Sequence, residues 1–154
     1  MRNGNVRRLF YKDCEKDNKT NLYERSAGTR KDSKGEDLMN YWDCARTVLP
    51  LSNCLKRHYA CVIVSGGMII ATGYNKSLEG CTTCAREGIT HNVGDYAECR
   101  SVHAEQMALL TRIEAYQEAE LYLVCDKDPD PTPCPICKRM MDFCGVRLRR
   151  ESDG

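Results

Sequence analysis

The chain has 154 residues, enough for one ordinary domain, and 23 basic against 22 acidic side chains leave a net charge of +1. That balance argues against a nucleic-acid or membrane surface, so an anionic ligand is expected to meet only a local patch of positive charge. The N-terminus lacks the apolar stretch of a secretion signal, and the apolar run at 60–64 is too short to cross a bilayer. We therefore expect a cytoplasmic protein with no membrane partner and no nucleic-acid partner.

Residues 1–36 are polar, charged and without hydrophobic period, and they predict a flexible tail. The character of the sequence then changes, so we place one domain at 37–150 and a C-terminal tail at 151–154. Apolar residues at helical spacing predict an amphipathic helix over 37–49, which Pro50 helps to stop.

Two runs of strand-forming residues, 60–65 and 68–73, flank Gly66 and Gly67 and predict a β-hairpin. A long loop over 75–100 follows. A loop of that length inside a compact domain usually has a function.

The second half of the chain alternates helices and strands. We predict a helix over 101–117 with Ser101 as its N-cap, a buried strand over 120–125, a short helix over 137–145 and a last strand over 146–150. The order α-β-β-α-β-α-β indicates an α/β fold in which helices pack on one sheet.

Eleven cysteines are many for a chain of this size, and without a secretion signal they favour metal binding and free thiols over a disulfide framework. Cys61 and Cys125 fall in apolar strands and Cys44 falls on the first predicted helix, so we expect them to be small core residues. The spacing of the others has to identify a metal site.

His103, Cys134 and Cys137 have the chemistry of a catalytic zinc site, which needs three protein ligands and one open position. A Cys-x-x-Cys pair at the start of a helix lets both sulfurs reach one ion, and the helix dipole there favours thiolate. Residues two apart on a mature helix point to nearly opposite sides, so His103 and Glu105 can face one centre only at the helix start. Glu105 is then a proton shuttle rather than a ligand.

A structural zinc site with an idle Glu105 is the alternative. It needs a fourth protein ligand to close the coordination shell, and Cys125 and Cys144 are the candidates for that position. Glu105 discriminates between the two interpretations, because pure metal binding has no use for an acid–base residue beside an open position.

The pattern H-x-E…P-C-x-x-C, here running from His103 to Glu105 and from Pro133 to Cys137, is the signature of zinc-dependent base deaminases. Together with "SNCLKR", "VIV", "IIATGYN", "CRSVHAEQ" and "PCPICKRMM" in this order, it resembles the deoxycytidylate (dCMP) deaminase branch of the cytidine deaminase superfamily. The resemblance covers about residues 38–150. It implies a three-layer α/β fold, with a central mixed sheet of four or five strands flanked by helices, and a homo-oligomer, often a hexamer.

The activity implied by this resemblance is the zinc-dependent hydrolytic deamination of dCMP to dUMP and ammonia, within pyrimidine nucleotide metabolism. Glu105 would deliver protons to N3 of cytosine and to the leaving ammonia, and the backbone N–H of Ala104 would help to hold the base carbonyl. Asn75, in the "GYN" stretch, would contact the sugar and base side of the pocket. A turn-forming role is the alternative for this asparagine.

The loop over 75–100 holds most of a second set of metal-binding side chains. Some dCMP deaminases carry a structural zinc near this place, with one ligand from the segment that matches "SNCLKR". Five side chains compete for its four positions: Cys54, Cys81, Cys84, His91 and Cys99. We favour Cys54, Cys84, His91 and Cys99, of which the first three match the family's positions, with Cys81 as the rival. Free thiols in an irregular loop are the alternative.

The 5′-phosphate of dCMP needs cations or N–H donors, and the sequence does not choose among Lys56, Arg57, Lys76, Arg86, Arg100 and Arg112. Lys76 stands where the family commonly has glycine, and the following "SLEG" lacks the usual proline, which weakens the expectation of allosteric control by dCTP and dTTP. The family normally continues beyond the last predicted strand, so a four-stranded sheet here would leave an edge for an oligomer partner to cover.

Two other functions stay open. One is a deaminase for another cytosine nucleoside or nucleotide, or for a nucleic-acid base. An editor of nucleic acid would be expected to show a basic track and aromatic platforms, whereas aromatic residues make up 7% of this chain. The other is a non-catalytic zinc-stabilised binding module.

Overall fold

The computed structural model describes residues 40–91, 93–94, 96–111 and 118–153. The tail expected over 1–36 and the end of the helix predicted over 101–117 lie outside these residues. None of the described helices has the length and apolar character that a membrane span requires.

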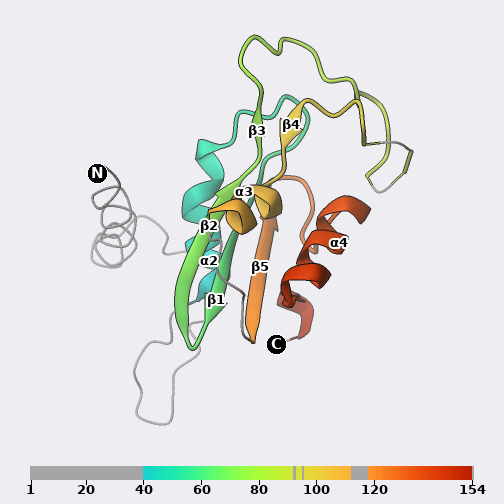
Figure 1. The fold of residues 1–154 in the computed structure, drawn as a ribbon. Helices are drawn as coiled ribbons and strands as arrows, with labels where there is room; N and C mark the ends of the chain where they lie inside the picture. The colour runs from blue at the N-terminus through green and yellow to red at the C-terminus, as the bar shows by residue number, and fades with distance from the viewer. Residues whose placement is uncertain (1–39, 92, 95, 112–117, 154) are drawn as a thin grey trace, which may run out of the picture. The chain divides into compact units, whose positions relative to one another are not determined.

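Short helices and strands alternate along the described part of the chain (Figure 1). The helices are α2 (Tyr41–Val48), α3 (Ala104–Leu110) and α4 (Pro135–Cys144), with 3-10 turns at Leu49–Leu51 and Glu151–Asp153. The strands are β1 (Tyr59–Ser65), β2 (Met68–Tyr74), β3 (Lys76–Ser77), β4 (Ser101–Val102), β5 (Ala119–Cys125) and β6 (Val146–Arg149).

Four of the strands form one mixed sheet in the order β2-β1-β5-β6. β1 pairs antiparallel with both β2 and β5, whereas β5 pairs parallel with β6. The predicted hairpin and the two later strands are confirmed, each within one residue of its expected bounds. Gly66 and Gly67 have φ values of 57° and 76°, the left-handed conformation that a two-residue hairpin turn of type I′ requires.

Helices cover both faces of this sheet (Figure 1). Successive side chains of a strand point to opposite faces, so each face has its own set of side chains to pack against a helix. On one face, the rings of Tyr41 and Trp42 in α2 pack against Tyr122 of β5, with centroids 5.0 and 4.8 Å apart. On the other face, Cys61 and Leu121 are fully buried in a core that they share with residues of α3 and α4. The predicted three-layer α/β fold with a mixed sheet is confirmed.

Gly73 of β2 determines how closely α3 approaches the sheet. A Cβ atom at this position would lie 2.0 Å from the carbonyl oxygen of Ala104 and 2.7 Å from the backbone nitrogen of Ala108. Backbone atoms cannot swing aside as the end of a flexible side chain can. Glycine therefore lets the first turn of α3 lie directly on β2, and that turn carries Glu105.

The start of α3 corrects one prediction. Ser101, expected as the N-cap, lies in β4, which pairs with β3 in a small ribbon outside the main sheet. Its hydroxyl oxygen is 2.9 Å from that of Ser77. Pairing with β3 keeps the chain extended through 102, so the helix begins only at Ala104 and His103 is its N-cap. The pairing of β3 with β4 also holds together the two ends of the segment over 75–100, which was expected to be a loop.

Candidate metal centre and active site

His103 projects from the end of α3 rather than from its side. Its backbone is extended, with φ −78° and ψ 157°, and the helix begins at the next residue. The side-chain oxygen of Gln106 accepts a hydrogen bond from the backbone N–H of His103 over 2.9 Å, which fixes the first turn. Because His103 precedes the helix, it escapes the opposite-face geometry of two helical residues, and it can share one centre with Glu105.

Cys134 and Cys137 occupy the start of α4. Cys134 is the N-cap, Pro135 is the first helical residue, and the backbone N–H of Cys137 donates to the Cys134 sulfur over 3.5 Å. Proline suits this position because its missing N–H has no intrahelical partner there. The helix begins two residues earlier than predicted and ends at Gly145, whose φ of 71° is the left-handed conformation typical of a helix end.

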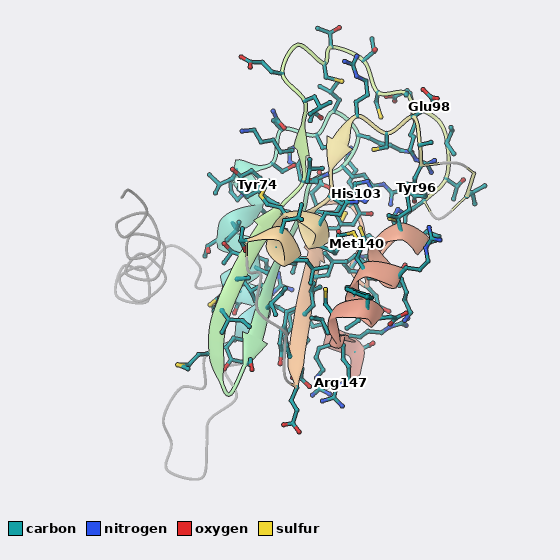
Figure 2. All side chains as sticks on the ribbon, viewed as in Figure 1. Tyr74, Tyr96, Glu98, His103, Met140 and Arg147 are labelled. Carbon is teal, nitrogen blue, oxygen red and sulfur yellow. The ribbon has the colours of Figure 1, made fainter. Side chains whose placement is uncertain are left out.

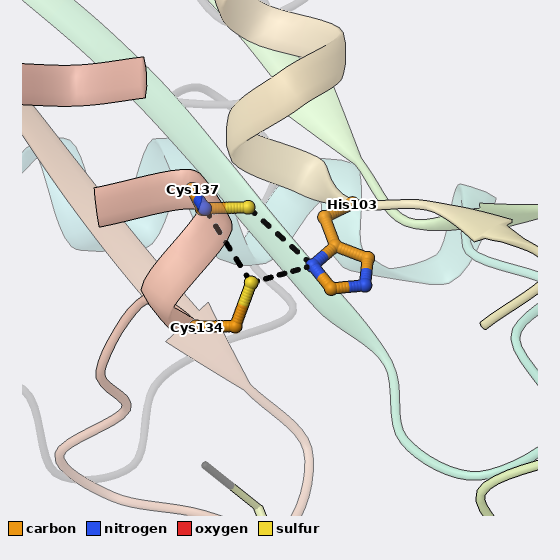
Figure 3. Close-up of side chains that lie close together, drawn as sticks. All are labelled: His103, Cys134 and Cys137. Carbon is orange, nitrogen blue, oxygen red and sulfur yellow. Dashed lines mark hydrogen bonds between the residues drawn. The ribbon is translucent and has the colours of Figure 1, made fainter. Parts of the chain in front are cut away.

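The three predicted ligands meet at one point (Figure 3). The Nδ1 atom of His103 lies 3.3 Å from the sulfur of Cys134 and 3.4 Å from that of Cys137. Bond lengths of about 2.0 Å to nitrogen and about 2.3 Å to sulfur put the two atoms roughly 3.5 Å apart on a tetrahedral zinc. Among the residues that the structure describes, this is the only group of three or more His, Cys, Asp or Glu side chains gathered within 4.8 Å.

The contacts within this group change how its members titrate in the absence of metal. Hydrogen bonds from Cys137 and His103 lower the pKa of Cys134 to about 4, although burial opposes the shift. Burial would lower the pKa of His103, but contacts with the sulfurs of Cys134 and Cys99 outweigh it and raise the pKa to about 10. The hydrogen bond to the Cys134 sulfur, together with burial, raises the pKa of Cys137. Without metal, the site therefore holds a Cys134 thiolate beside a His103 imidazolium. It becomes able to bind a cation when the protons of His103 and Cys137 leave.

Glu105 is the second residue of α3 and is only 4% exposed. It lines the same pocket as His103 and Ala104. Burial raises the pKa of its carboxyl, although a backbone hydrogen bond and the neighbouring His103 act in the opposite direction. A buried carboxyl with a raised pKa, beside a metal-ligand cluster that it does not join, has the properties of a proton carrier.

Asn75 follows β2 and lies in the wall of the same pocket. Its Oδ1 accepts hydrogen bonds from the hydroxyl of Ser52 over 2.6 Å and from the backbone N–H of Tyr59 over 2.8 Å. Its Nδ2 donates to the carbonyl of Arg57 over 2.8 Å. The amide thus ties the segment before β1 to the end of β2, and an Nδ2 group has a second N–H with which to donate.

The two cysteines considered as a fourth ligand do not join the cluster within the described part of the chain. Cys125 closes β5 beside Asp126, with its sulfur 3.5 Å from a carboxylate oxygen. Cys144 is the last residue of α4, at the opposite end of the helix from Cys134. Within the described residues the site therefore offers three side chains that could hold a metal ion, the number of a catalytic rather than a closed structural zinc site.

The five side chains considered for a second zinc line the same pocket as His103: Cys54, Cys81, Cys84, His91 and Cys99. Several have partners within the protein. The Nε2 atom of His91 is 2.8 Å from the carbonyl oxygen of Thr132, and the Cys99 sulfur is 3.6 Å from Nε2 of His103. A second zinc at these residues stays a prediction.

The cations considered for a phosphate differ in what they already contact. Lys56 donates to the carbonyls of Arg86 and Ile89. Arg86, only 5% exposed, donates to the carbonyls of Thr90 and Val93. Arg57 and Arg100 also line the pocket, Lys76 is exposed on β3, and Arg112 lies outside the described residues.

Tyr96 is a residue of the site that sequence reasoning missed. Its ring lies near that of His103 (Figure 2), in an edge-on arrangement with centroids 5.7 Å apart. The guanidinium carbon of Arg86 lies 3.8 Å from the centroid of the Tyr96 ring. The Tyr96 hydroxyl is 3.4 Å from Nδ1 of His91. A lone tyrosine in an irregular loop has no periodicity or spacing that could have identified it.

The sequence of this chain is similar to those of known deaminases. A family model described as the cytidine and deoxycytidylate deaminase zinc-binding region matches residues 36–148. The deoxycytidylate deaminase of Schizosaccharomyces pombe is 31% identical over 113 residues, which are 70% of this chain and 34% of that protein. The deoxycytidylate deaminase of Saccharomyces cerevisiae is 40% identical over 101 residues, 62% of this chain and 30% of that protein. The chain thus spans about a third of the length of these relatives.

Two solved structures of a dCMP deaminase have a fold similar to that of this chain. The dCMP deaminase of the cyanophage S-TIM5 in apo form matches with a TM-score of 0.50 and 27% identity, over 71% of this chain and 79% of that one. The same enzyme in complex with dCMP and dUMP matches with a TM-score of 0.50 and 27% identity, over 73% of this chain and 82% of that one.

Proposed function

Since the chain belongs to the family of the cytidine and deoxycytidylate deaminase zinc-binding region, we propose that it is a zinc-dependent hydrolase that converts dCMP to dUMP and ammonia. One observation carries the proposal: Nδ1 of His103 and the sulfurs of Cys134 and Cys137 converge, and the buried Glu105 lines the same pocket without joining them. A non-catalytic metal-binding module needs the three converging donor atoms, but it has no need of a buried carboxyl beside them.

His103, Cys134 and Cys137 are the residues that would hold the zinc. When bound there, zinc supplies Lewis-acid activation of a water molecule. The three donors are an imidazole and two thiols, which suit zinc better than the oxygen-loving magnesium or calcium.

Glu105 is the proton carrier of the proposed reaction. It takes one proton from the attacking water and delivers it to N3 of the cytosine. It then passes the second proton of that water to the amino group, so that the C4–N bond breaks, ammonia leaves and the water oxygen becomes the C4 carbonyl of dUMP. Ala104 is the first residue of α3, so its backbone N–H belongs to the helix end and is available to the base carbonyl. The second N–H of Asn75 Nδ2 is the donor that we assign to the sugar and base side of the substrate.

Arg100 is the cation that we propose for the 5′-phosphate. Its exposed side chain lines the pocket, whereas the donors of Lys56 and Arg86 are used on loop carbonyls. A planar guanidinium matches phosphate oxygens in a bidentate fashion. Arg100→Ala should raise KM for dCMP far more than KM for deoxycytidine, because only the nucleotide carries the phosphate. An equal effect on both substrates would contradict this assignment.

The remaining expectations belong to the same proposal. A second zinc would be held by loop side chains, and metal counting tests it, since one zinc per fully loaded chain would contradict it. A cytoplasmic homo-oligomer is the expected state. Among the described residues, β2 and β6 are the outer strands of the sheet, and their edges are where a partner could pair. Light scattering of the purified protein measures the number of chains.

The test of the function is ammonia release by the zinc-loaded protein from dCMP, CMP, deoxycytidine, dCTP and cytosine. We expect dCMP to be the best substrate. A preference for another of these compounds would support a deaminase but contradict dCMP as its substrate. Zinc binding without turnover of any of them would favour the non-catalytic binding module.

A further inference from the structure

The imidazole of His103 has two nitrogens, and each faces sulfur. Nδ1 faces Cys134 and Cys137, the pair with which it forms the metal-ligand cluster. Nε2, on the other side of the ring, lies 3.6 Å from the sulfur of Cys99. This second contact has no part in the proposed chemistry, and it comes from a different segment of the chain.

Cys99 is held in place at the end of the long loop. Its backbone N–H donates to the carbonyl of Tyr96 over 3.0 Å, and the backbone N–H of Ser101 donates to its sulfur. Ser101 itself is fixed by the pairing of β4 with β3. The Cys99 sulfur is therefore a fixed acceptor beside the ring, half-buried rather than free in solvent.

The ring of His103 is confined from another side as well. Tyr96 meets it edge-on at 5.7 Å, with an interplanar angle of 72°, and Arg86 lies over the ring of Tyr96. The imidazole therefore has a sulfur neighbour at each of its nitrogens and an aromatic ring beside it. Rotation of the ring about the side chain would break the contact with Cys99.

We propose that Cys99 is a positioning residue for the metal centre, whose sulfur accepts the Nε2–H of His103 and so keeps the lone pair of Nδ1 directed at the metal. A neutral imidazole carries one N–H, and the nitrogen that bears it is determined by the hydrogen bond that it makes. Metal-bound histidines commonly donate their other N–H to a hydrogen-bond acceptor, most often an oxygen, and loss of that acceptor weakens metal binding. The inference rests on the proposed function only in requiring zinc at His103.

This assignment also bears on the second zinc. A sulfur that accepts from His103 is directed at the catalytic cluster, so it is a poor fourth ligand for another ion. The remaining candidates for a loop zinc are then Cys54, Cys81, Cys84 and His91, with Cys81 in the place first given to Cys99.

The test is zinc affinity, measured by competition with a chromophoric chelator in the absence of substrate. Cys99→Ala removes the acceptor, and we expect zinc to bind about 10- to 100-fold more weakly. Cys99→Ser keeps a hydroxyl acceptor at the same position and should recover most of the affinity. Cys144→Ala is the matched control, because it removes a thiol at the far end of α4 and should leave the affinity of the wild type.

A spectroscopic readout separates positioning from general stability. With cobalt in place of zinc, Cys99→Ala should shift the visible absorption bands of the metal, whereas Cys144→Ala should not. Circular dichroism and thermal melts of the metal-loaded variants show whether Cys99→Ala has a folding defect. If it has one, the cobalt spectrum of Cys99→Ser is the deciding measurement, because this variant replaces the sulfur acceptor by an oxygen.

Two results would overturn the inference. One is wild-type zinc affinity and an unchanged cobalt spectrum in Cys99→Ala. The other is a Cys99→Ala protein that loses one of two bound zinc ions while the site at His103 keeps its affinity, since Cys99 would then be a ligand of the second ion. Failure of the proposed function is distinct, because the wild type itself would then bind no zinc or turn over no substrate.

Discussion

The carboxyl of Glu105 lies buried in the first turn of α3, in the wall of the pocket that His103 also lines. It has almost no contact with water, and its burial raises its pKa. A carboxyl whose pKa is raised holds a proton more readily than an ordinary glutamate does, and a proton carrier has to hold a proton in this way. The same burial has a cost to stability that can be measured without any substrate.

Glu105→Gln should change how the stability of the metal-free protein depends on pH. The folded-state pKa of Glu105 lies above its unfolded value, so its contribution is most favourable below the ordinary glutamate pKa and is lost as pH rises through the folded value. Urea unfolding of the metal-free protein across this range should show a smaller loss of stability in Glu105→Gln than in the wild type. Glu79→Gln, at an exposed position, should follow the wild type. Parallel curves for Glu105→Gln and the wild type would contradict the burial argument.

Zinc binding should release protons. At pH 7 the metal-free site holds a proton on His103, whose pKa is raised to about 10, and another on Cys137, whose pKa is also raised. Both must leave for the metal, so we expect release of about two protons per zinc. Calorimetry in buffers of different ionisation enthalpy measures this number, and zinc affinity should fall as the pH falls. Binding without proton release would show that the ligands are deprotonated before the metal arrives.

At the scale of elements, local sequence patterns predicted what local chemistry determines. The Gly66-Gly67 turn and the end of α4 at Gly145 follow from backbone conformations that glycine favours, and the strand β1 follows from a short continuous run of buried apolar residues. The prediction of Ser101 as the N-cap of α3 was wrong, because a contact between residues distant in sequence determines where this helix begins. Pairing of Ser101 with Ser77 keeps the chain extended, and no local signal at Ser101 reports a partner in that ribbon.

Gly73→Ala tests the close packing that carries α3 on β2. The added Cβ would meet the backbone of Ala104 at 2.0 Å, so α3 must move away from the sheet. We expect a loss of about 2–3 kcal/mol in the free energy of unfolding, the upper part of the range for overpacked cores. Zinc affinity should weaken as well, because His103 adjoins the displaced turn. Thr72→Ala, at the preceding position of β2, is the control and should keep wild-type zinc affinity. A stable Gly73→Ala protein with normal zinc affinity would contradict the packing argument.

At the scale of the whole molecule, the site joins segments that are far apart in the sequence. The ligand types and their spacing were predictable, because zinc chemistry restricts the choice of residues. The surroundings were not. Tyr96 against His103, and His91 against the carbonyl of Thr132, are contacts between irregular segments without periodicity. The loop set proposed for a second zinc remains a prediction for the same reason.

Removing zinc should lower the thermal stability of the whole domain. The ligands come from the starts of α3 and α4, so the metal connects two helices that carry part of the core. Zinc at 1,000 times its dissociation constant adds about 4 kcal/mol to the folded state. Calorimetry should therefore give a melting temperature roughly 10 °C or more lower after chelation. His103→Ala should melt at the same temperature with and without chelator. A wild-type melt that is insensitive to chelator would contradict a bound structural link between the helices.

The most direct test of the central claim compares zinc content and dCMP turnover in the wild type and Glu105→Gln. If Glu105 carries protons beside a three-ligand zinc site, the variant should hold as much zinc as the wild type and lose about 1,000-fold or more in kcat, since acid–base groups contribute about 10²- to 10⁴-fold. Turnover in the variant within about ten-fold of the wild type, at equal zinc content, would contradict the claim.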